Sequence, residues 1–252
     1  MQDHQSAAAG DDAAPAAGAG QGGLEWRDGR VPVSTRFQDP YFSLDHGLDE
    51  TRHVFLAGND LPARLRPGFH IAELGFGTGL NALATVAAWR AARAETARDA
   101  TPPIRFTSFE GFAMSAAQMA RALSAFPVLE QDAEVLVRAW EADPHGTIRL
   151  EGLELRVIHG DVRDTLPDWS GRADAWFLDG FSPARNPEMW QPELMDEVAR
   201  HTVPGGSFAT YTAAGFVREG LAKAGFAVVR VPGFGRKRHM TRGRLEGQVA
   251  HG

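Results

Sequence analysis

The sequence contains no cysteine among its 252 residues. This absence excludes disulfides, thiolate metal sites and thiol nucleophiles together. Long hydrophobic runs are also missing, because no stretch approaches the ~20 apolar residues that a membrane helix needs. The N-terminus has neither the basic region nor the apolar core of a signal peptide. We therefore expect a cytoplasmic protein without a membrane-bound segment.

Charge and histidine content narrow the possibilities further. The formal net charge is −6, which argues mildly against a protein coated with nucleic acid, although a global sum says little about one face. The nine histidines form no HxxxH pair and no cluster with acids at ligand spacing. We therefore expect no metal site.

The composition changes twice along the chain. Residues 1–23 are mostly Ala, Gly and Asp, and a segment with so little to bury is expected to be a disordered tail. Residues 24–69 contain two short candidate strands around an Asp28-Gly29 turn and a helix-like stretch over 47–57, which predicts an extension packed on the main domain. Residues 70–252 are expected to form that domain around one sizeable core.

From residue 70 onward, short apolar runs alternate with helical periodicity. Candidate strands begin near residues 70, 104, 153, 174, 207 and 226. This alternation predicts right-handed βαβ crossovers and a mostly parallel sheet that is covered on both faces. In such a sheet the ligand lies at the carboxyl ends of the strands.

A glycine-rich loop follows the first of these strands. Gly75, Gly77 and Gly79 form a GxGxG pattern, but position 80, where a dinucleotide-binding loop has its third glycine, is Leu. The spacing favours an S-adenosylmethionine loop; a tight turn that binds nothing is the alternative. The residues expected to hold the cofactor here are Glu73, Gly75, Phe76, Gly77, Thr78, Gly79 and Asn81.

Acids end the next strands. Glu110 closes the second strand, where a carboxylate can accept hydrogen bonds from both ribose hydroxyls of a nucleoside. Asp161 follows the third strand and either accepts from an adenine amino group or caps the next helix. Asp179 ends the fourth strand, where it either caps a helix or takes part in a reaction.

Several long motifs then occur in a familiar order. Residues 36–59, 73–81, 174–190, 214–226 and 233–240 closely resemble the methyltransferase domain of the MnmC/MnmD family. The resemblance runs from about residue 24 to the end of the chain. It departs from the family pattern at Ser182, at Gly111-Phe112 and at His239, where the family often has Ala, Lys-Phe and an acid.

The resemblance implies a fold and an activity. The fold is a class I methyltransferase, α/β and Rossmann-like, with a mostly parallel seven-stranded sheet. The activity is transfer of a methyl group from S-adenosylmethionine to the exocyclic primary amine of 5-aminomethyl-(2-thio)uridine at the tRNA wobble position. Some family members carry a second, flavin-dependent oxidase domain. This chain stops soon after its sixth candidate strand and is similar to the stand-alone, MnmD-like form, so no FAD is expected.

In this reading Asp179 presents the acceptor amine. Its surroundings resemble the [DN]PP[YF] loop of amino-group methyltransferases, and Asp179 either aims the nitrogen lone pair or also takes a proton. It would lie beside the cofactor, and Phe181 would stack on the target base. The missing cysteine agrees with this chemistry, because methylation of a pyrimidine at C5 needs a thiolate.

The resemblance also indicates where tRNA would lie. A basic run near the C-terminus is either a solvated face or a phosphate-facing surface, and the family favours the second. The wobble base has to leave its stack to reach the cofactor. The residues expected to contact the anticodon region are Tyr41, Phe42, Arg185, Phe234, Arg236, Lys237 and Arg238.

Two other functions stay open at this stage. One is a small-molecule amine methyltransferase or aminopropyltransferase, for which the basic run would be superfluous. The other is a non-catalytic RNA-binding module, against which the glycine loop, Glu110 and Asp179 argue. If tRNA is the substrate, a separate enzyme is expected to supply the aminomethyl precursor.

Overall fold

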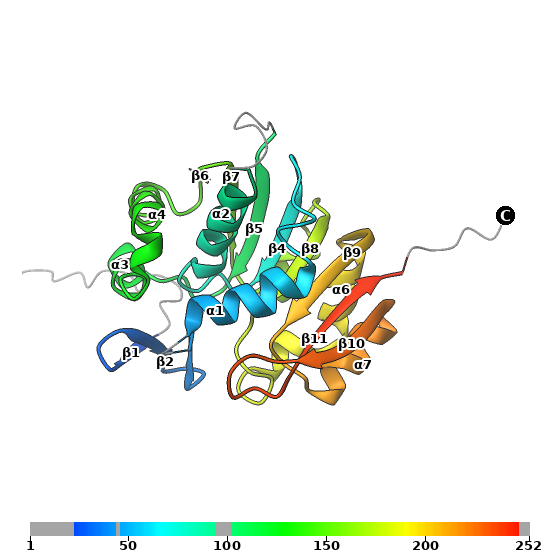
Figure 1. The fold of residues 1–252 in the computed structure, drawn as a ribbon. Helices are drawn as coiled ribbons and strands as arrows, with labels where there is room; N and C mark the ends of the chain where they lie inside the picture. Colours follow the sequence, from blue (N-terminus) through cyan, green and yellow to red (C-terminus); the bar gives the residue numbers. More distant parts are fainter. Residues whose placement is uncertain (1–22, 44–45, 94–101, 247–252) are drawn as a thin grey trace, which may run out of the picture.

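The computed structural model describes residues 23–43, 46–93 and 102–246 (Figure 1). The predicted disordered tail, residues 1–23, lies outside this range except for Gly23. No described helix is long and apolar enough to cross a membrane.

A sheet of eight strands forms the centre of the described structure, in the order β10-β11-β9-β8-β4-β5-β7-β6. The strands are β4 (His70–Leu74), β5 (Ile104–Glu110), β6 (Thr147–Leu150), β7 (Leu153–His159), β8 (Ala173–Leu178), β9 (Thr202–Thr210), β10 (Phe226–Pro232) and β11 (His239–Leu245). The five strands from β9 to β7 run parallel, whereas β6, β10 and β11 pair antiparallel at the two sides. The Rossmann-like, mostly parallel fold is thus confirmed. It has one strand more than expected, because β6 and β7 form a hairpin at one edge.

Helices cover both faces of this sheet (Figure 1). One face carries α1 (Gly47–Thr51), the π-helical turn η1 (Arg52–Leu56), η2 (Ala57–Asn59), α2 (Leu80–Arg93), α3 (Ala116–Leu123), η3 (Pro127–Leu129) and α4 (Glu130–Ala142). The other face carries α5 (Val162–Thr165), η4 (Pro187–Trp190), α6 (Pro192–Arg200) and α7 (Gly215–Lys223).

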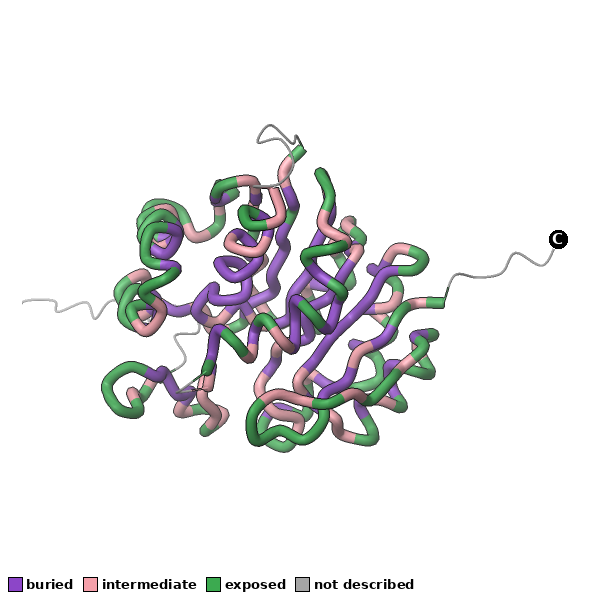
Figure 2. Tube along the Cα trace, in the orientation of Figure 1, coloured by how far each residue is buried: buried purple, intermediate pink, exposed green. Residues whose placement is uncertain are grey.

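The central strands are buried from both sides, as the purple tube in Figure 2 shows. Successive side chains of a strand point to opposite faces. On β8, Ala175 and Phe177 therefore join the core under α1 and α2, while Trp176 and Leu178 join the core under α6 and α7. Double burial explains why β8 is apolar at nearly every position.

A small antiparallel sheet precedes the main domain. It consists of β1 (Leu24–Arg27), β2 (Val31–Ser34) and β3 (Asp39–Pro40) in sequence order. The ring of Phe37, between β2 and β3, stacks on Phe181 with 4.6 Å between the ring centroids. The Asp39 carboxylate accepts a hydrogen bond from the Ser182 N–H at 2.9 Å. These contacts hold the small sheet beside the carboxyl end of β8.

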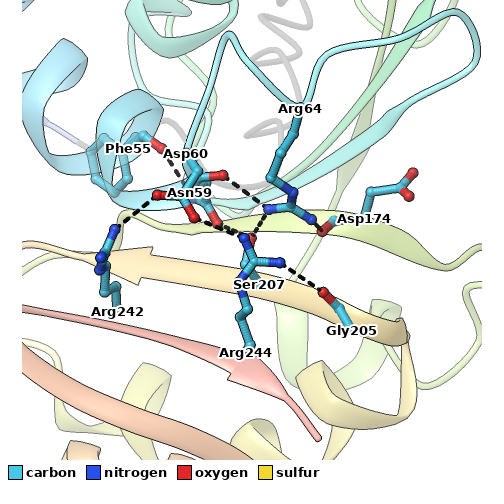
Figure 3. Close-up of polar contacts among 9 residues, drawn as sticks. All are labelled: Phe55, Asn59, Asp60, Arg64, Asp174, Gly205, Ser207, Arg242 and Arg244. Carbon is cyan, nitrogen blue, oxygen red and sulfur yellow. Dashed lines mark hydrogen bonds and ion pairs between the residues drawn. The ribbon is translucent and has the colours of Figure 1, made fainter. Parts of the chain in front are cut away.

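A buried polar network fastens the segment after η1 to the sheet (Figure 3). The Asn59 side chain donates to the carbonyl of Phe55 at 3.0 Å and accepts from the Ser207 hydroxyl at 2.6 Å. Arg64 donates to the carbonyls of Asn59 and Asp174, at 2.9 and 3.1 Å. Because Asn59 is fully buried, its amide has no water to replace these partners.

We expect Asn59→Ala to lower the free energy of unfolding by about 2 kcal/mol, because it leaves buried partners without hydrogen bonds. The adjacent Asp60→Asn is the control: its ion pairs with Arg242 and Arg244 are exposed, so its loss should stay below about 1 kcal/mol. Urea denaturation measures both changes. Equal, small losses in the two variants would contradict this view of the network.

Candidate active site

A cavity of about 940 Å³ lies where β4, β5 and β8 end. Its wall is built from the small N-terminal sheet, the glycine loop, the segments that follow β5, β7 and β8, and the connection between β10 and β11. This is the edge at which a parallel α/β sheet binds its ligands. A cavity of this size accommodates a nucleoside cofactor together with part of an acceptor.

The glycine loop approaches other parts of the chain so closely that side chains would not fit without displacing them. Gly75 has a φ of +89°, and a Cβ atom there would collide with the carbonyl of Asp179. Gly77 has a φ of +55°, and a Cβ atom at this position would lie only 3.1 Å from the ring of Tyr41. The loop therefore joins the end of β4 to the end of β8 and leaves its backbone open toward the cavity.

Most residues predicted to bind the cofactor do line this cavity. They are Gly75, Phe76, Gly77, Thr78, Asn81, Glu110, Asp161 and Asp179. Of the described residues predicted for this role, Glu73 and Gly79 are absent from the wall. Glu73 is fully buried behind it, and Gly79 lies against Phe76 and Leu136.

The Glu110 carboxylate is immobilised by backbone. One oxygen accepts from the N–H of Gly77 at 2.9 Å and the other from the N–H of Phe112 at 2.6 Å. Each oxygen keeps a second lone pair for a further donor. Glu110 can therefore receive a pair of neighbouring hydroxyls, as the sequence predicts.

Asp161 caps the N-terminus of α5, which is one of the two roles predicted for it from the sequence. Its side chain accepts from the N–H of Arg163 at 2.9 Å at the start of α5, and it also forms an ion pair with the Arg163 guanidinium. That pairing holds the pKa of Asp161 below its usual range. The residue also lines the cavity, so the predicted contact with adenine stays a prediction.

A chain of hydrogen bonds runs behind Asp179. The Asn81 amide donates to Asp179 Oδ2 at 2.7 Å and to Glu73 Oε1 at 2.8 Å. Its oxygen accepts from the Thr51 hydroxyl at 3.0 Å. The other oxygen of Glu73 accepts from Ser108 at 2.6 Å. Every polar atom of the Asn81 side chain is thus used, and the amide fixes the Asp179 carboxylate in one orientation.

Burial shifts the pKa of both acids. It raises the pKa of Glu73 well above its usual range, which favours the neutral form of this supporting side chain. Burial also raises the pKa of Asp179 to about 7, with a smaller contribution from Glu50 in the same direction. The hydrogen bond from Asn81 and the positive charge of Lys237 oppose that rise. Asp179 can consequently gain and lose a proton near neutral pH.

Glu50, Thr51 and Tyr211 also belong to this region, although the sequence analysis did not predict them as site residues. Glu50 and Tyr211 line the cavity, and Glu50 accepts a hydrogen bond from Lys237 Nζ at 2.6 Å. Tyr211 directly follows the last residue of β9, so the rule that ligands lie at strand ends would have indicated it. No comparable signal marks Glu50 and Thr51 in the short helix α1.

Only some of the residues predicted to contact tRNA line the cavity. Tyr41, Phe42, Phe234, Arg236 and Lys237 line the cavity. Phe42 is itself buried, which leaves little of its ring for a base.

Arg185 and the remaining basic residues near the C-terminus lie outside the cavity wall. Arg185 and Arg238 are exposed and do not belong to the cavity wall. Arg242 and Arg244 extend toward η2 and pair with Asp60 (Figure 3). The basic run is therefore not one surface.

Phe181, the second residue predicted for the reaction, lines the cavity and is held by aromatic neighbours. Phe37 stacks on it, and Tyr41 meets it edge-on with 5.1 Å between ring centroids. Among residues 23–43, 46–93 and 102–246, no group of three or more His, Cys, Asp or Glu could hold a metal ion.

Comparison with known proteins agrees with this geometry. The family described as S-adenosyl-L-methionine-dependent methyltransferase matches residues 127–246. The structure is similar to that of MNMC2 from Aquifex aeolicus, with a TM-score of 0.70 over 91% of this chain and 72% of that chain, at 24% identity. Residues 127–246 of the chain thus match the S-adenosyl-L-methionine-dependent methyltransferases, and S-adenosylmethionine is the cofactor that this match indicates.

The resemblance to the MnmC/MnmD family is also confirmed. The chain is 45% identical over 236 residues to the tRNA 5-methylaminomethyl-2-thiouridine biosynthesis bifunctional protein MnmC of Stutzerimonas stutzeri, and 44% identical over 237 residues to that of Pseudomonas aeruginosa. Each alignment covers 90% of this chain. The chain spans about a third of the length of these relatives, 35% and 36%.

The residues of the cavity fit the cofactor. The glycine loop exposes backbone without side chains, since a Cβ atom at Gly75 would collide with the carbonyl of Asp179. The buried Glu110 carboxylate is already oriented by two N–H groups. Both features suit a nucleoside that has to lie against the chain.

We expect Glu110→Gln to weaken binding of S-adenosylhomocysteine by about 10- to 100-fold, because an amide NH₂ would face one of the two backbone donors. Asp161→Asn is the matched control, since its carboxylate is occupied by Arg163, and it should have a smaller effect. Isothermal titration calorimetry measures both affinities. If Asp161→Asn weakens binding more than Glu110→Gln, the assignment of Glu110 is wrong.

Proposed function

We propose that this chain methylates the exocyclic primary amine of 5-aminomethyl-(2-thio)uridine at the tRNA wobble position and yields 5-methylaminomethyl-(2-thio)uridine. The observation that carries the proposal is Asp179 at the cavity wall, whose carboxylate is oriented by Asn81 and whose backbone carbonyl packs against Gly75. The names of the MnmC relatives supply the substrate class. With tRNA as substrate, we also propose that the protein acts in the cytoplasm, after a separate enzyme has made the aminomethyl precursor.

The chemistry needs few groups. S-adenosylmethionine supplies an electrophilic methyl group on a sulfonium when it is bound. An alkyl amine is protonated at neutral pH and has no free lone pair until that proton is removed. Asp179, whose burial raises its pKa to about 7, can accept this proton and release it to solvent. The regenerated carboxylate can then hold a remaining N–H so that the lone pair points to the methyl carbon.

The surroundings of Asp179 favour both roles over a structural cap. Its Oδ2 is held by Asn81, which leaves Oδ1 for the substrate. Phe181 next to it offers an aromatic wall to a base that has left its stack. Arg236 and Lys237 at the same cavity are placed to meet the phosphates of the tRNA strand.

The direct test is methyl transfer from labelled S-adenosylmethionine to tRNA that carries the aminomethyl precursor, with nucleoside mass spectrometry of the product. We expect the precursor to gain one methyl group, and Asp179→Ala to lower the rate by at least about 100-fold while S-adenosylhomocysteine still binds. Polyamines serve as competing acceptors. Methylation of polyamines but not of tRNA would overturn the substrate, and an active Asp179→Ala would overturn the role of Asp179.

The pH dependence provides a separate test. The rate constant kcat at saturating tRNA should fall as the pH drops below about 7, because Asp179 then becomes protonated. Lys237→Met should move the midpoint of this fall to higher pH, since the Lys237 charge lowers the pKa of Asp179. Glu50→Gln should move it to lower pH, since Glu50 has the opposite effect. Midpoints that stay unchanged in both variants would show that another group titrates.

A further inference from the structure

The acceptor loop, residues 179–182, is held at successive positions by side chains from distant parts of the chain. In addition to Asn81 on Asp179, three further residues bond to its backbone. The Tyr211 hydroxyl donates to the Gly180 carbonyl at 2.7 Å, the Trp190 indole donates to the Phe181 carbonyl at 2.9 Å, and Asp39 accepts from the Ser182 N–H at 2.9 Å. The loop is therefore set in one conformation before any substrate arrives.

The bond from Tyr211 joins two residues of the cavity wall and ends on a backbone carbonyl. The buried Trp190 does not line the cavity, and Asp39, which does, bonds to an N–H group. Burial raises the pKa of the Tyr211 hydroxyl, and the negative charge of Asp179 acts in the same direction. The hydroxyl thus stays protonated and remains a donor at all physiological pH values.

A methyl acceptor of the proposed kind needs two oxygens. Once the amine is neutral, it has two N–H groups, and both must be held if the lone pair is to keep one direction. Asp179 supplies one oxygen. The carbonyl of Gly180 is the next backbone acceptor along the chain, and after bonding Tyr211 it keeps one of its two lone pairs. Without that bond the peptide after a glycine has more freedom to rotate.

We propose that Tyr211 is a positioning residue which fixes the Gly180 carbonyl as the second oxygen for the substrate amine, beside Asp179. The inference rests on the proposed function, because it requires an amine acceptor. Tyr211 acts through Gly180 and does not itself touch the reacting atoms.

The ring of Tyr211 has a second task that can be separated from the first. Lys237 Nζ lies 4.1 Å from the centre of this ring and pairs with Glu50. The ring therefore helps to hold the positive charge that acts on Asp179. Tyr211→Phe removes the hydroxyl but keeps the ring, whereas Tyr211→Leu removes both.

The test compares Tyr211→Phe with Thr241→Val. The buried Thr241 hydroxyl donates to the carbonyl of Thr212 at 2.7 Å, which is the same kind of bond one residue beyond Tyr211. Neither Thr241 nor Thr212 belongs to the cavity wall formed by the described residues. Thr241→Val therefore controls for the loss of a buried hydroxyl that has no part in the reaction.

We expect Tyr211→Phe to lower kcat for methylation of precursor-bearing tRNA by at least about tenfold. The KM for tRNA and the affinity for S-adenosylhomocysteine should stay within about twofold of wild type, because the ring and the cofactor loop are intact. Thr241→Val should keep the wild-type kcat even where its Tm falls as much as that of Tyr211→Phe. Tyr211→Leu should in addition move the pH midpoint of kcat upward, and Tyr211→Phe should not.

The outcomes separate this inference from the proposed function. Wild-type protein that methylates the tRNA together with a Tyr211→Phe variant of unchanged kcat would overturn the role of Tyr211 and leave the function standing. Equal losses of kcat in Tyr211→Phe and Thr241→Val would show a merely structural role and overturn it as well. Wild-type protein that fails to methylate the amine would overturn the function and the inference with it.

Discussion

The arrangement of the site depends on one side-chain amide. Two carboxyl groups, those of Glu73 and Asp179, approach the same point between β4 and β8, where burial penalises charge. Asn81 lies between them and donates one N–H to each. In this orientation its oxygen is also satisfied, because it accepts a hydrogen bond from the Thr51 hydroxyl. An acid in place of Asn81 would add a third buried carboxyl group, and an apolar residue would remove one donor from each acid.

This amide also couples the glycine loop to the end of β8. Asn81 lies in the first turn of α2, directly after the glycine loop. Gly75 in that loop packs against the carbonyl of Asp179 so closely that any side chain would separate the two strands. The start of α2, the end of β4 and the end of β8 are therefore fixed relative to one another. In-line displacement needs such control, because misplacement by a fraction of an ångström costs rate.

Much of this could be predicted from the sequence, and the remainder could not for physical reasons. Periodicity predicts the buried parallel strands, and the strand-end rule then finds Glu110 and Asp179. Periodicity fails for β11, where Met240, Thr241 and Gly243 are buried without an apolar alternation, and the neighbouring arginines give the segment the composition of a solvated run. The helix α4 was missed although Ala133, Leu136 and Trp140 form an apolar stripe. Thr51 and Glu50 are not predictable at all, because α1 meets the site only through tertiary packing.

The distribution of charge with depth explains how a chain of net charge −6 can suit a polyanionic substrate. The carboxylates of Asp179 and Glu110 lie at the wall of the cavity. Four arginines that line the same cavity, Arg27, Arg36, Arg163 and Arg236, are all exposed.

An ammonium group and a sulfonium would repel each other when they meet, and buried carboxylates offset that repulsion where water is excluded. Exposed guanidinium groups attract phosphate from outside, where salt screens them. If tRNA is the substrate as proposed, opposite charges at different depths would let one site draw in a negatively charged strand and still stabilise two cationic groups at its centre. The global charge of the chain conceals this division, because the acids and the arginines cancel in the sum.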